Sequence, residues 1–340
     1  MHFASDNCSG VAPQIMAALV RANEGQAPGY GTDPLTLRLT AQIREIFDAP
    51  EAEIALVPTG TAANALSLAV LAAPWSAIFA HELAHITRDE CGAPEFFTHG
   101  AKLVSVPGSH GRMSPEALRA VITARGTGGV HSVQRGAVSL TNVTEAGTVY
   151  TAVETAALCA VARDFGLPVH LDGARFANAV VATGTSPADL SWRAGIDILS
   201  LGGTKNGCMG VEAVVLFDPS RAWEFQLRRK RGGHLVSKHR FLAAQMSAWL
   251  ENGLWLDLAA HANRMAARLA AGLIAKPGVS LRGPVEANLM FTTWESGLHS
   301  RLRAGGASYY PEDGAGFEGA RLVTGWSTTP GDVDRFLALI

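Results

Sequence analysis

The 340-residue sequence predicts an α/β fold: a large domain with a mostly parallel β-sheet and a small C-terminal α+β domain. Short apolar runs alternate with helical stretches across the middle of the chain, an order typical of a parallel sheet covered by helices on both faces. After about residue 240 this alternation gives way to one long amphipathic pattern followed by short apolar runs. Because 48% of the residues are hydrophobic and 17% are charged, the chain can bury a large core, which excludes a disordered or fibrous protein.

The large domain is expected to contain seven strands with helices between several of them. The strand candidates are residues 54–57, 77–80, 103–106, 137–141, 169–171, 198–201 and 213–217. The helix candidates are residues 62–73, 114–124 and 152–165. Ser114 followed by Pro115 is a common helix start, and Gly166 followed by Pro168 marks the end of the third helix.

The small domain begins with a helix whose apolar residues recur every three or four positions. This face consists of Leu258, Ala262, Met265, Leu269 and Leu273. Strand candidates follow at residues 279–281, 289–293 and 322–324, and residues 332–339 are expected to form a closing helix. We therefore predict a large domain over residues 1–245 and a small domain over residues 246–340.

Charge and cysteine content exclude several classes of protein. The formal net charge of −2 gives the whole chain no attraction to nucleic acid or to an anionic membrane. The four cysteines (Cys8, Cys91, Cys159 and Cys208) form no C-x-x-C pair, which argues against a disulfide framework and favours a reducing compartment. The first residues lack the basic and apolar segments of a signal peptide, so we expect a cytoplasmic location.

The uncharged run from residue 54 to residue 80 is long enough to span a membrane. Pro58, Gly60 and Pro74 interrupt this run, and several Thr, Asn and Ser residues make it polar. We interpret it as a strand, a glycine turn, a helix and a break.

Residues 81–85 match the H-E-x-x-H pattern of zinc hydrolases, in which two histidines share one face of a helix and Glu82 is the general base. The surroundings disfavour this interpretation. Arg88 and Cys91 stand where a longer zinc motif would place Gly and His, and an apolar strand directly precedes the segment. A zinc hydrolase is therefore retained only as an unlikely alternative, and we predict no metal site.

Three local motifs point to a ligand site. Residues 57–64 form a strand end, a Gly-Thr turn and a helix start, where free N–H groups favour a phosphate, although any βα turn can use Gly and Thr. Asp172 ends an apolar strand, where it either faces a ligand crevice or caps the next helix. Lys205 stands alone in a turn of Gly, Thr and Asn after another strand, where it either forms a Schiff base or lies on the surface.

One basic cluster extends over residues 228–240. Nucleic-acid binding requires a basic patch with stacking aromatic residues, and only Trp223, Phe225 and Phe241 are near. We therefore expect this cluster to meet a cofactor phosphate or to lie at the edge of a subunit, and we expect no nucleic-acid or membrane partner.

Taken together, these motifs occur in an order that resembles the L-threonine aldolases, a family of fold-type I pyridoxal-phosphate enzymes in the β-eliminating lyase group. The matching segments are residues 5–7, 29–34, 59–61, 85–86, 172–175, 202–207 and 321–324. Residues 89–97 and the turn at 202–207 are most similar to the low-specificity and phenylserine aldolase branch. The resemblance covers nearly the whole chain and implies an aspartate aminotransferase-like large domain.

The resemblance also implies roles for individual residues. Lys205 would bind the cofactor covalently, Asp172 would pair with its ring nitrogen, and His85 would stack on its ring. Its phosphate would be held by Gly60, Thr61 and Thr204, with Arg229 or Arg231 from a neighbouring subunit. Ser5, Arg175 and Arg321 would bind the substrate carboxylate. Tyr30, from a dimer partner, and His131, as a second active-site histidine, would lie nearby, and so would Asn142, although the segment 140–144 departs from the usual family pattern.

The activity implied is cleavage of L-threonine, L-allo-threonine or phenylserine-type β-hydroxy-α-amino acids to glycine and an aldehyde. A base must then remove the proton of the β-hydroxyl, and His85, His131 or an ordered water are the candidates. The family's assembly would be a homotetramer of catalytic dimers. A different lyase of the same group, which would release pyruvate and ammonia, and a non-catalytic carrier of the cofactor remain as alternatives.

Overall fold

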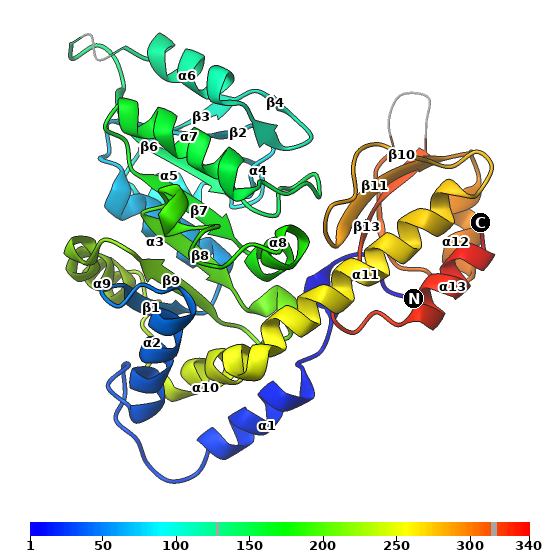
Figure 1. The fold of residues 1–340 in the computed structure, drawn as a ribbon, viewed down its shortest axis with the longest axis horizontal. Coiled ribbons are helices and arrows are strands. Elements are labelled where there is room, and N and C mark those ends of the chain that lie inside the picture. Colours follow the sequence, from blue (N-terminus) through cyan, green and yellow to red (C-terminus); the bar gives the residue numbers. More distant parts are fainter. Residues whose placement is uncertain (127–128, 314–317) are drawn as a thin grey trace.

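In the computed structural model, which describes residues 1–126, 129–313 and 318–340, a seven-stranded sheet forms the centre of the larger body (Figure 1). Its strand order is β1-β9-β8-β7-β6-β2-β3. The strands are β1 (Glu53–Val57), β2 (Ser76–His81), β3 (Lys102–Val106), β6 (Gln134–Thr141), β7 (Val169–Gly173), β8 (Ile198–Gly202) and β9 (Glu212–Leu216). All seven predicted strands are present, within a few residues of the expected limits.

Strand direction in this sheet determines where the loops gather. β2 pairs in parallel with β3 and β6, and the parallel pairing continues through β7 to β8. β9 is antiparallel to both of its neighbours, β8 and β1, so β1 again runs in the direction of β8. Six of the seven strands therefore end at the same edge, which confirms the mostly parallel sheet.

Helices cover both faces of the sheet, as the alternation of strands and helices predicted. On one face, α3 (Gly60–Leu71) and α9 (Ala222–Arg231) bury apolar side chains against β1, β8 and β9. On the other face, the core includes side chains of α6 (Pro115–Ala124), α7 (Ala152–Asp164) and α8 (Phe176–Thr183). The uncharged run thus consists of β1, a turn, α3 and β2, and within the described residues no helix is long and apolar enough to cross a membrane.

The smaller body is built on a second sheet of order β10-β11-β13-β12, which is antiparallel throughout. Its strands are β10 (Ser280–Leu281), β11 (Leu289–Trp294), β12 (Tyr310–Pro311) and β13 (Glu318–Val323). The helices α12 (Leu298–Ala304) and α13 (Pro330–Ala338) pack with the sheet in a separate apolar cluster. This architecture agrees with the α+β character expected for the C-terminal region.

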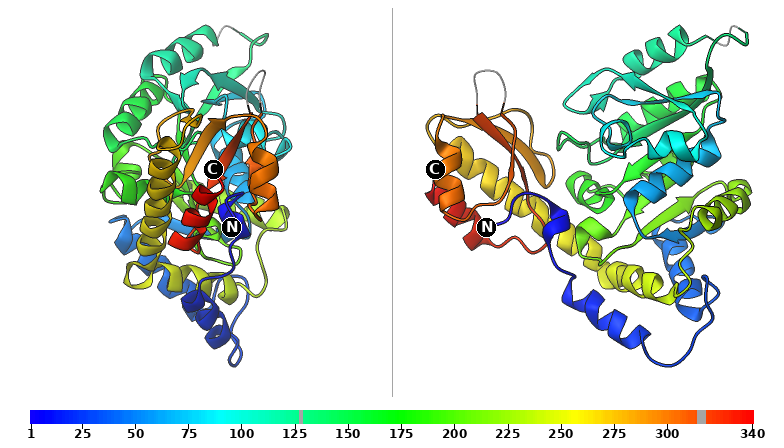
Figure 2. Two further views of the ribbon diagram at one scale, coloured as in Figure 1. Left: turned by 90° about the vertical axis from the view of Figure 1, so that its right-hand side faces the viewer. Right: turned by 180° about the vertical axis from the view of Figure 1, so that it is seen from behind.

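The helix α11 (Leu254–Ile274) joins the two bodies (Figure 1). Its 21 residues extend over about 30 Å, so its first half packs in the core of the larger body and its second half in that of the smaller one. The N-terminal segment also connects the two bodies (Figure 2). Phe3 donates its N–H to the Ser308 carbonyl and is buried in the apolar cluster of the smaller body, whereas the helices that follow it in the chain pack on the larger body. A boundary at residue 245 stays a prediction.

The remaining elements had no clear counterpart in the sequence patterns. They are α1 (Pro13–Ala22), α2 (Pro34–Ile46), α4 (His85–Arg88), α5 (Ala93–Phe97), α10 (Arg240–Leu250), the hairpin of β4 (Gly108–Ser109) and β5 (Arg112–Met113), and five 3-10 helices. Two of the 3-10 helices border the site: η1 (Asp6–Cys8) and η3 (Thr204–Asn206).

Candidate active site

Four loops at the shared edge of the seven-stranded sheet carry most of the residues predicted to bind the cofactor. β1 leads to the turn at residues 59–61, β2 to His85, β7 to residues 172–175, and β8 to Lys205. These strands run in the same direction, so their carboxyl ends meet at one edge, where open α/β sheets bind ligands. In register, Asp172 lies beside Thr141 on one side and Ser200 on the other.

The turn around Lys205 is fixed while the lysine side chain is free. Gly203 donates its N–H to Glu212 Oε2 at 2.8 Å, and the Asn206 side chain donates to the Trp255 carbonyl at 2.8 Å. Within the described part of the chain, the half-buried Lys205 ammonium has no hydrogen bond or ion pair. A lysine held in this way can react with a carbonyl group without first breaking a contact.

The first turn of α3 offers an anion site. Thr59 caps the helix: its hydroxyl accepts the N–H of Ala62 at 3.1 Å and its carbonyl accepts that of Ala63 at 3.1 Å. The N–H groups of Gly60 and Thr61 precede the first helical hydrogen bonds, so they are available to a ligand. A Cβ atom at Gly60 would meet no atom within 4 Å, which shows that there is open space at this turn.

Four side chains near this turn form a continuous hydrogen-bonded network. His85 Nδ1 lies 2.8 Å from Glu90 Oε1, and Asn64 Nδ2 lies 2.9 Å from both Glu90 Oε1 and Asp172 Oδ2. The other oxygen of Asp172 accepts the N–H of Ala174 at 3.0 Å. The hydrogen bond to Glu90 raises the pKa of His85 despite partial burial. Burial raises the pKa of Glu90, although the bonds from His85 and Asn64 oppose this effect.

A further buried carboxyl group lies beside Lys205. Glu212 ends the pairing between β8 and β9, opposite Gly202, and its side chain is buried. Burial raises the pKa of Glu212 to about 7, although hydrogen bonds from Thr204 and Gly203 partly oppose this shift. The Thr204 hydroxyl also accepts the N–H of Val211 at 3.1 Å. Thr204 therefore stabilises the lysine turn, and its predicted contact with a phosphate stays a prediction.

The predicted carboxylate clamp is assembled from three distant segments. Arg175 forms a two-pronged, fully buried ion pair with Asp6, at 2.7 and 3.0 Å. Burial opposes ionisation of Asp6, but Arg175 and Lys205 outweigh it and hold the pKa of Asp6 below its usual range. Arg321, on β13, donates to the carbonyl of Ala4, the residue before Ser5.

Arg175 and Arg321 are close enough to repel one another. Burial and then the charge of Arg175 lower the pKa of Arg321. Two neighbouring guanidinium groups with one buried counter-charge attract a further anion, and a carboxylate matches their planar donor groups. The structure thus brings Arg175, Arg321 and Ser5 together on the substrate side.

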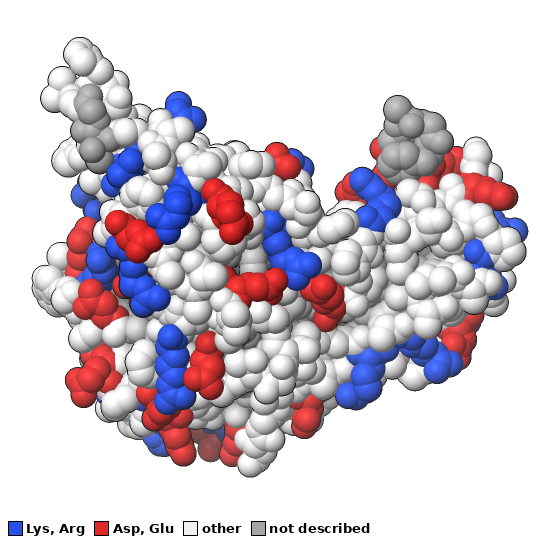
Figure 3. Space-filling model, turned by 45° about the horizontal axis from the view of Figure 1, so that its top comes forward, with Lys and Arg blue, Asp and Glu red and all other residues white. Residues whose placement is uncertain are grey.

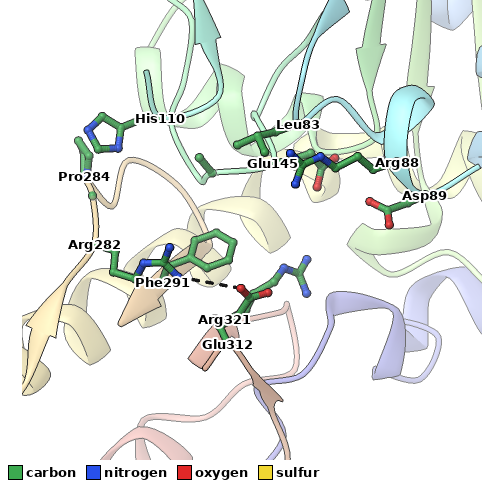
Figure 4. Close-up of a pocket in the computed structure, with 12 residues that line it drawn as sticks. Leu83, Arg88, Asp89, His110, Glu145, Arg282, Pro284, Phe291, Glu312 and Arg321 are labelled. Atoms are coloured by element: carbon green, nitrogen blue, oxygen red, sulfur yellow. Dashed lines mark ion pairs between the residues drawn. The ribbon is translucent and has the colours of Figure 1, made fainter. Parts of the chain in front are cut away.

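A cleft of about 500 Å³ opens beside Arg321, between the two bodies (Figure 3). Leu83, Arg88, His110 and Glu145 line the wall formed by the larger body, and Arg282, Phe291 and Glu312 line the opposite wall (Figure 4). Arg282 and Glu312 form a loose ion pair at 4.0 Å. Glu145 contributes to the raised pKa of His85 and acts electrostatically on Arg175 and Arg321, so this cleft adjoins the predicted site.

His131 does not lie with these residues in its own chain. It is exposed and precedes β6 by three residues, at the amino end of that strand. The eight residues of β6 extend over about 25 Å, so His131 lies at the opposite edge of the sheet from Asp172. His131 therefore lies away from these residues in its own chain, and its role as a second active-site histidine stays a prediction.

Asn142 lies close to Asp172 and helps to shape the loop that leads to Tyr150. Its side chain donates to the Tyr150 carbonyl at 2.9 Å and accepts the Tyr150 N–H at 3.2 Å. Its own N–H donates to the Asp172 carbonyl. The amide keeps one further N–H group, and the predicted role of Asn142 in binding substrate stays a prediction.

The residues expected to come from a neighbouring subunit differ in their exposure to solvent. Arg229 is buried within its own chain and donates to the Leu56 carbonyl at 3.1 Å, and its predicted contact with a cofactor phosphate stays a prediction. Burial also lowers its pKa to about 10. Arg231 is exposed, and the half-exposed Tyr30 ring lies against Lys230, outside the cleft. Roles for Arg231 and Tyr30 in a partner's site stay predictions.

The H-E-x-x-H segment does not form one helix. His81 is the last residue of β2, and its Nδ1 accepts the N–H of Leu83 at 3.0 Å, whereas His85 begins α4. The two histidines therefore do not have the helical geometry that the zinc interpretation requires.

Sequence reasoning assigned no role to several polar residues that hold the site together. These are Asp6, Asn64, Glu90, Glu212 and Asn288, all buried. Asp6, Asn64 and Glu90 lie inside segments that the sequence analysis identified as motifs, so their positions in those motifs could have pointed to a role in the site. Asn288, which donates to Asp6 Oδ2 at 3.1 Å, follows no visible pattern.

Comparisons with known proteins agree with this geometry. The chain is 43% identical over 334 residues to the low specificity L-threonine aldolase of Pseudomonas aeruginosa, covering 98% of this chain and 94% of the relative. It is 40% identical over 336 residues to the enzyme of the same name from a Pseudomonas species, covering 99% and 96%. A solved Leishmania major threonine aldolase superposes with a TM-score of 0.94 at 30% identity, covering 99% and 98% of the two chains. The beta-eliminating lyase family model matches residues 2–295, so the chain belongs to the beta-eliminating lyase family, as the motif resemblance predicted.

Proposed function

We propose that this protein is a pyridoxal-phosphate-dependent L-threonine aldolase, a carbon–carbon lyase that cleaves β-hydroxy-α-amino acids to glycine and an aldehyde. The observation that carries the proposal is the position of Lys205, Asp172 and the Gly60 turn at one sheet edge, facing the Arg175–Arg321 clamp. Two relatives named low specificity L-threonine aldolase, at least 40% identical over nearly their whole length, support the same activity.

The residues present fit the cofactor. The turn at Gly60 and Thr61 has room and free N–H groups for a phosphate, Lys205 has an unpaired amine for the aldehyde, and Asp172 has a carboxylate for the ring nitrogen. When bound, the cofactor supplies an electron-withdrawing ring that stabilises negative charge at the substrate Cα.

The clamp determines which bond breaks. Arg175 and Arg321, with Ser5, bind the substrate carboxylate and so fix the rotation about the bond from nitrogen to Cα. Because the two carboxylate oxygens of Asp6 accept two hydrogen bonds from Arg175, this end of the clamp is rigid before substrate binds. Held in this way, the substrate would direct its β-substituent into the cleft, and the cofactor would supply the electron-withdrawing group that accepts the electrons of the Cα–Cβ bond.

A base must accept the proton of the β-hydroxyl. Of the two histidines considered as the base, His85 lies at this edge of the sheet and His131 lies at the opposite edge in its own chain. Its Nδ1 is bound to Glu90, which leaves Nε2 to take the proton directly or through a water. We therefore assign His85 as the base, with Glu90 orienting its ring.

The proposal also covers the oligomeric state, the cellular location and the substrates that the enzyme accepts. We propose a homotetramer of dimers in which the exposed Tyr30 reaches a partner's site, and light scattering of purified protein would test this assembly. We propose a cytoplasmic location, which four free cysteines support. Phenylserine-type substrates are included because a cleft of about 500 Å³ has room for an aromatic ring.

Product analysis tests the reaction. Purified protein supplied with pyridoxal phosphate and L-threonine is expected to release equal amounts of glycine and acetaldehyde, and Lys205→Ala is expected to release neither. Pyruvate and ammonia in their place would show a different lyase of the same group. Absorption spectra with and without glycine, recorded first, would show whether the protein binds the cofactor at all.

A further inference from the structure

The amide of Asn64 is shared between two buried carboxylates. Asn64 lies one helical turn after Gly60 on α3 and is 2% exposed. Its Nδ2 atom is 2.9 Å from Asp172 Oδ2 and 2.9 Å from Glu90 Oε1. Ionised carboxylates only accept hydrogen bonds, so the NH₂ group must face them, and it has one hydrogen for each.

This single side chain connects the two ends of the proposed cofactor site. At one end, Glu90 holds His85, the residue proposed to stack on the ring. At the other end is Asp172, the proposed partner of the ring nitrogen. Asn64 lies on α3, His85 on α4, Glu90 in the turn after α4, and Asp172 on β7. Among the described side chains, no hydrogen bond other than those of Asn64 links Glu90 to Asp172.

Two neighbouring buried carboxylates disfavour one another's ionisation. Asp172 contributes to the raised pKa of Glu90, and the hydrogen bond from Asn64 opposes that rise. An N–H directed at each oxygen stabilises the anionic form of both groups and sets the distance between them.

We propose that Asn64 is a positioning residue of the cofactor site, whose shared amide holds Glu90, and with it His85, in fixed relation to Asp172. This inference rests on the proposed function, because it concerns pyridoxal phosphate bound between His85 and Asp172. Asn64 itself is not assigned any contact with substrate.

The test measures the Kd of pyridoxal phosphate between pH 6 and pH 8.5 for the wild type, Asn64→Leu and Asn64→Ser. Leucine has a similar size and no donor, and serine has one hydroxyl that can serve only one carboxylate. Ser67→Ala is the matched control, because Ser67 is buried on the same helix and, among the described residues, its hydroxyl donates only to the Ala63 carbonyl. Circular dichroism and thermal melting establish that each variant is folded, and Asn64→Ser keeps the test open if Asn64→Leu does not fold.

We expect Asn64→Leu to raise the Kd at least about 10-fold at pH 6.5, with a ratio to wild type that shrinks toward pH 8.5. Without the amide, one of the hydrogen bonds that oppose the raised pKa of Glu90 is lost, so Glu90 takes up a proton at higher pH and the acid-side loss of affinity moves upward. Asn64→Ser should be intermediate, and Ser67→Ala should stay within twofold of wild type.

The groups that act electrostatically on Asp172 are His85, Glu90, His170, Arg175 and Glu212, with Lys205 beside Glu212. All of them are unchanged in these variants, so a shifted pH dependence is attributable to residue 64. A ratio of Kd values that is the same at every pH, or below twofold throughout, would overturn the inference. A wild type that binds no pyridoxal phosphate would instead overturn the proposed function.

Discussion

At the edge of the seven-stranded sheet, His85, Glu90, Asn64 and Asp172 hold one another by contacts of 2.8 to 2.9 Å, whereas across the cleft Arg282 and Glu312 approach only to 4.0 Å. The first group is mostly buried, and the side chains of the second pair are 44% and 43% exposed. Buried polar groups depend on each of their partners, while exposed charges are screened by water and gain little from pairing. The cofactor wall is therefore expected to tolerate substitution poorly, and the outer cleft wall to tolerate it well.

The largest effect is expected for Asp6→Asn. This change leaves the buried Arg175 without its counter-charge, and breaking a buried ion pair costs about 3 to 5 kcal/mol of unfolding free energy. Urea unfolding would measure the loss. Because the pKa of Asp6 lies below its usual 3.8, the difference from wild type should be complete above that pH and shrink as the pH falls through the lower folded value. An unchanged stability at pH 7 would place Asp6 outside the rigid part of the site.

The next largest effect is expected for Arg321→Ala, which affects binding more than folding. The loss of a charged hydrogen-bond partner for the substrate carboxylate should lower kcat/KM for L-threonine about 100-fold. Stability should change little, because the only side-chain hydrogen bond of Arg321 among the described residues is its donation to the Ala4 carbonyl. An unchanged kcat/KM would remove Arg321 from the clamp.

A smaller effect is expected in the pH profile of kcat/KM. If His85 acts as base, kcat/KM should rise with pH as His85 loses its proton. Because the hydrogen bond with Glu90 raises the pKa of His85, this rise should be centred above 6.5, the ordinary pKa of histidine. Glu90→Gln removes that charge, so the limb should move to lower pH and the ratio of activity at pH 6 to that at pH 8 should increase severalfold. A profile that does not respond to this substitution would argue for another base.

The smallest effect is expected for Glu312→Gln on the outer wall. The pair with Arg282 is long and half exposed, so its loss should change the unfolding free energy by less than about 0.5 kcal/mol. Activity toward L-threonine should stay within about threefold of wild type. A large loss in either measurement would show that both walls of the cleft are equally constrained.

The sequence was a good guide to elements with a strong local signal. Apolar runs of strand length marked all seven strands of the large sheet, and cap residues such as Ser114 marked helix starts. Helices without such signals were missed, for example α9, whose sequence is dominated by charge and whose few apolar residues pack only in the folded chain. The reversed direction of β9 was also not visible, because an apolar run has the same composition in either direction.

Among the site residues too, those with a local sequence signal were predicted and those that depend on tertiary contacts were not. Lys205, Asp172 and the turn at Gly60 stood out because each follows a strand at the edge where parallel strands end. The place of His131 at the opposite edge of the sheet was not visible, because its spacing from Asn142 along the chain says nothing about the strand of eight residues between them. Asn142 was assigned to substrate, although its amide is used by Tyr150, a contact that depends on how a loop closes.

The sequence by itself determined the alternation of strands and helices in the large domain, the candidate lysine and the family resemblance, because hydrophobic period and turn chemistry are local properties of the chain. Only the tertiary structure decided which polar groups hold one another. Asp6 meets Arg175 across 169 positions, and Asn64 meets Asp172 across 108. Such pairs form because a buried donor or acceptor must find a partner wherever the packed core places one, and that partner is not encoded in neighbouring residues.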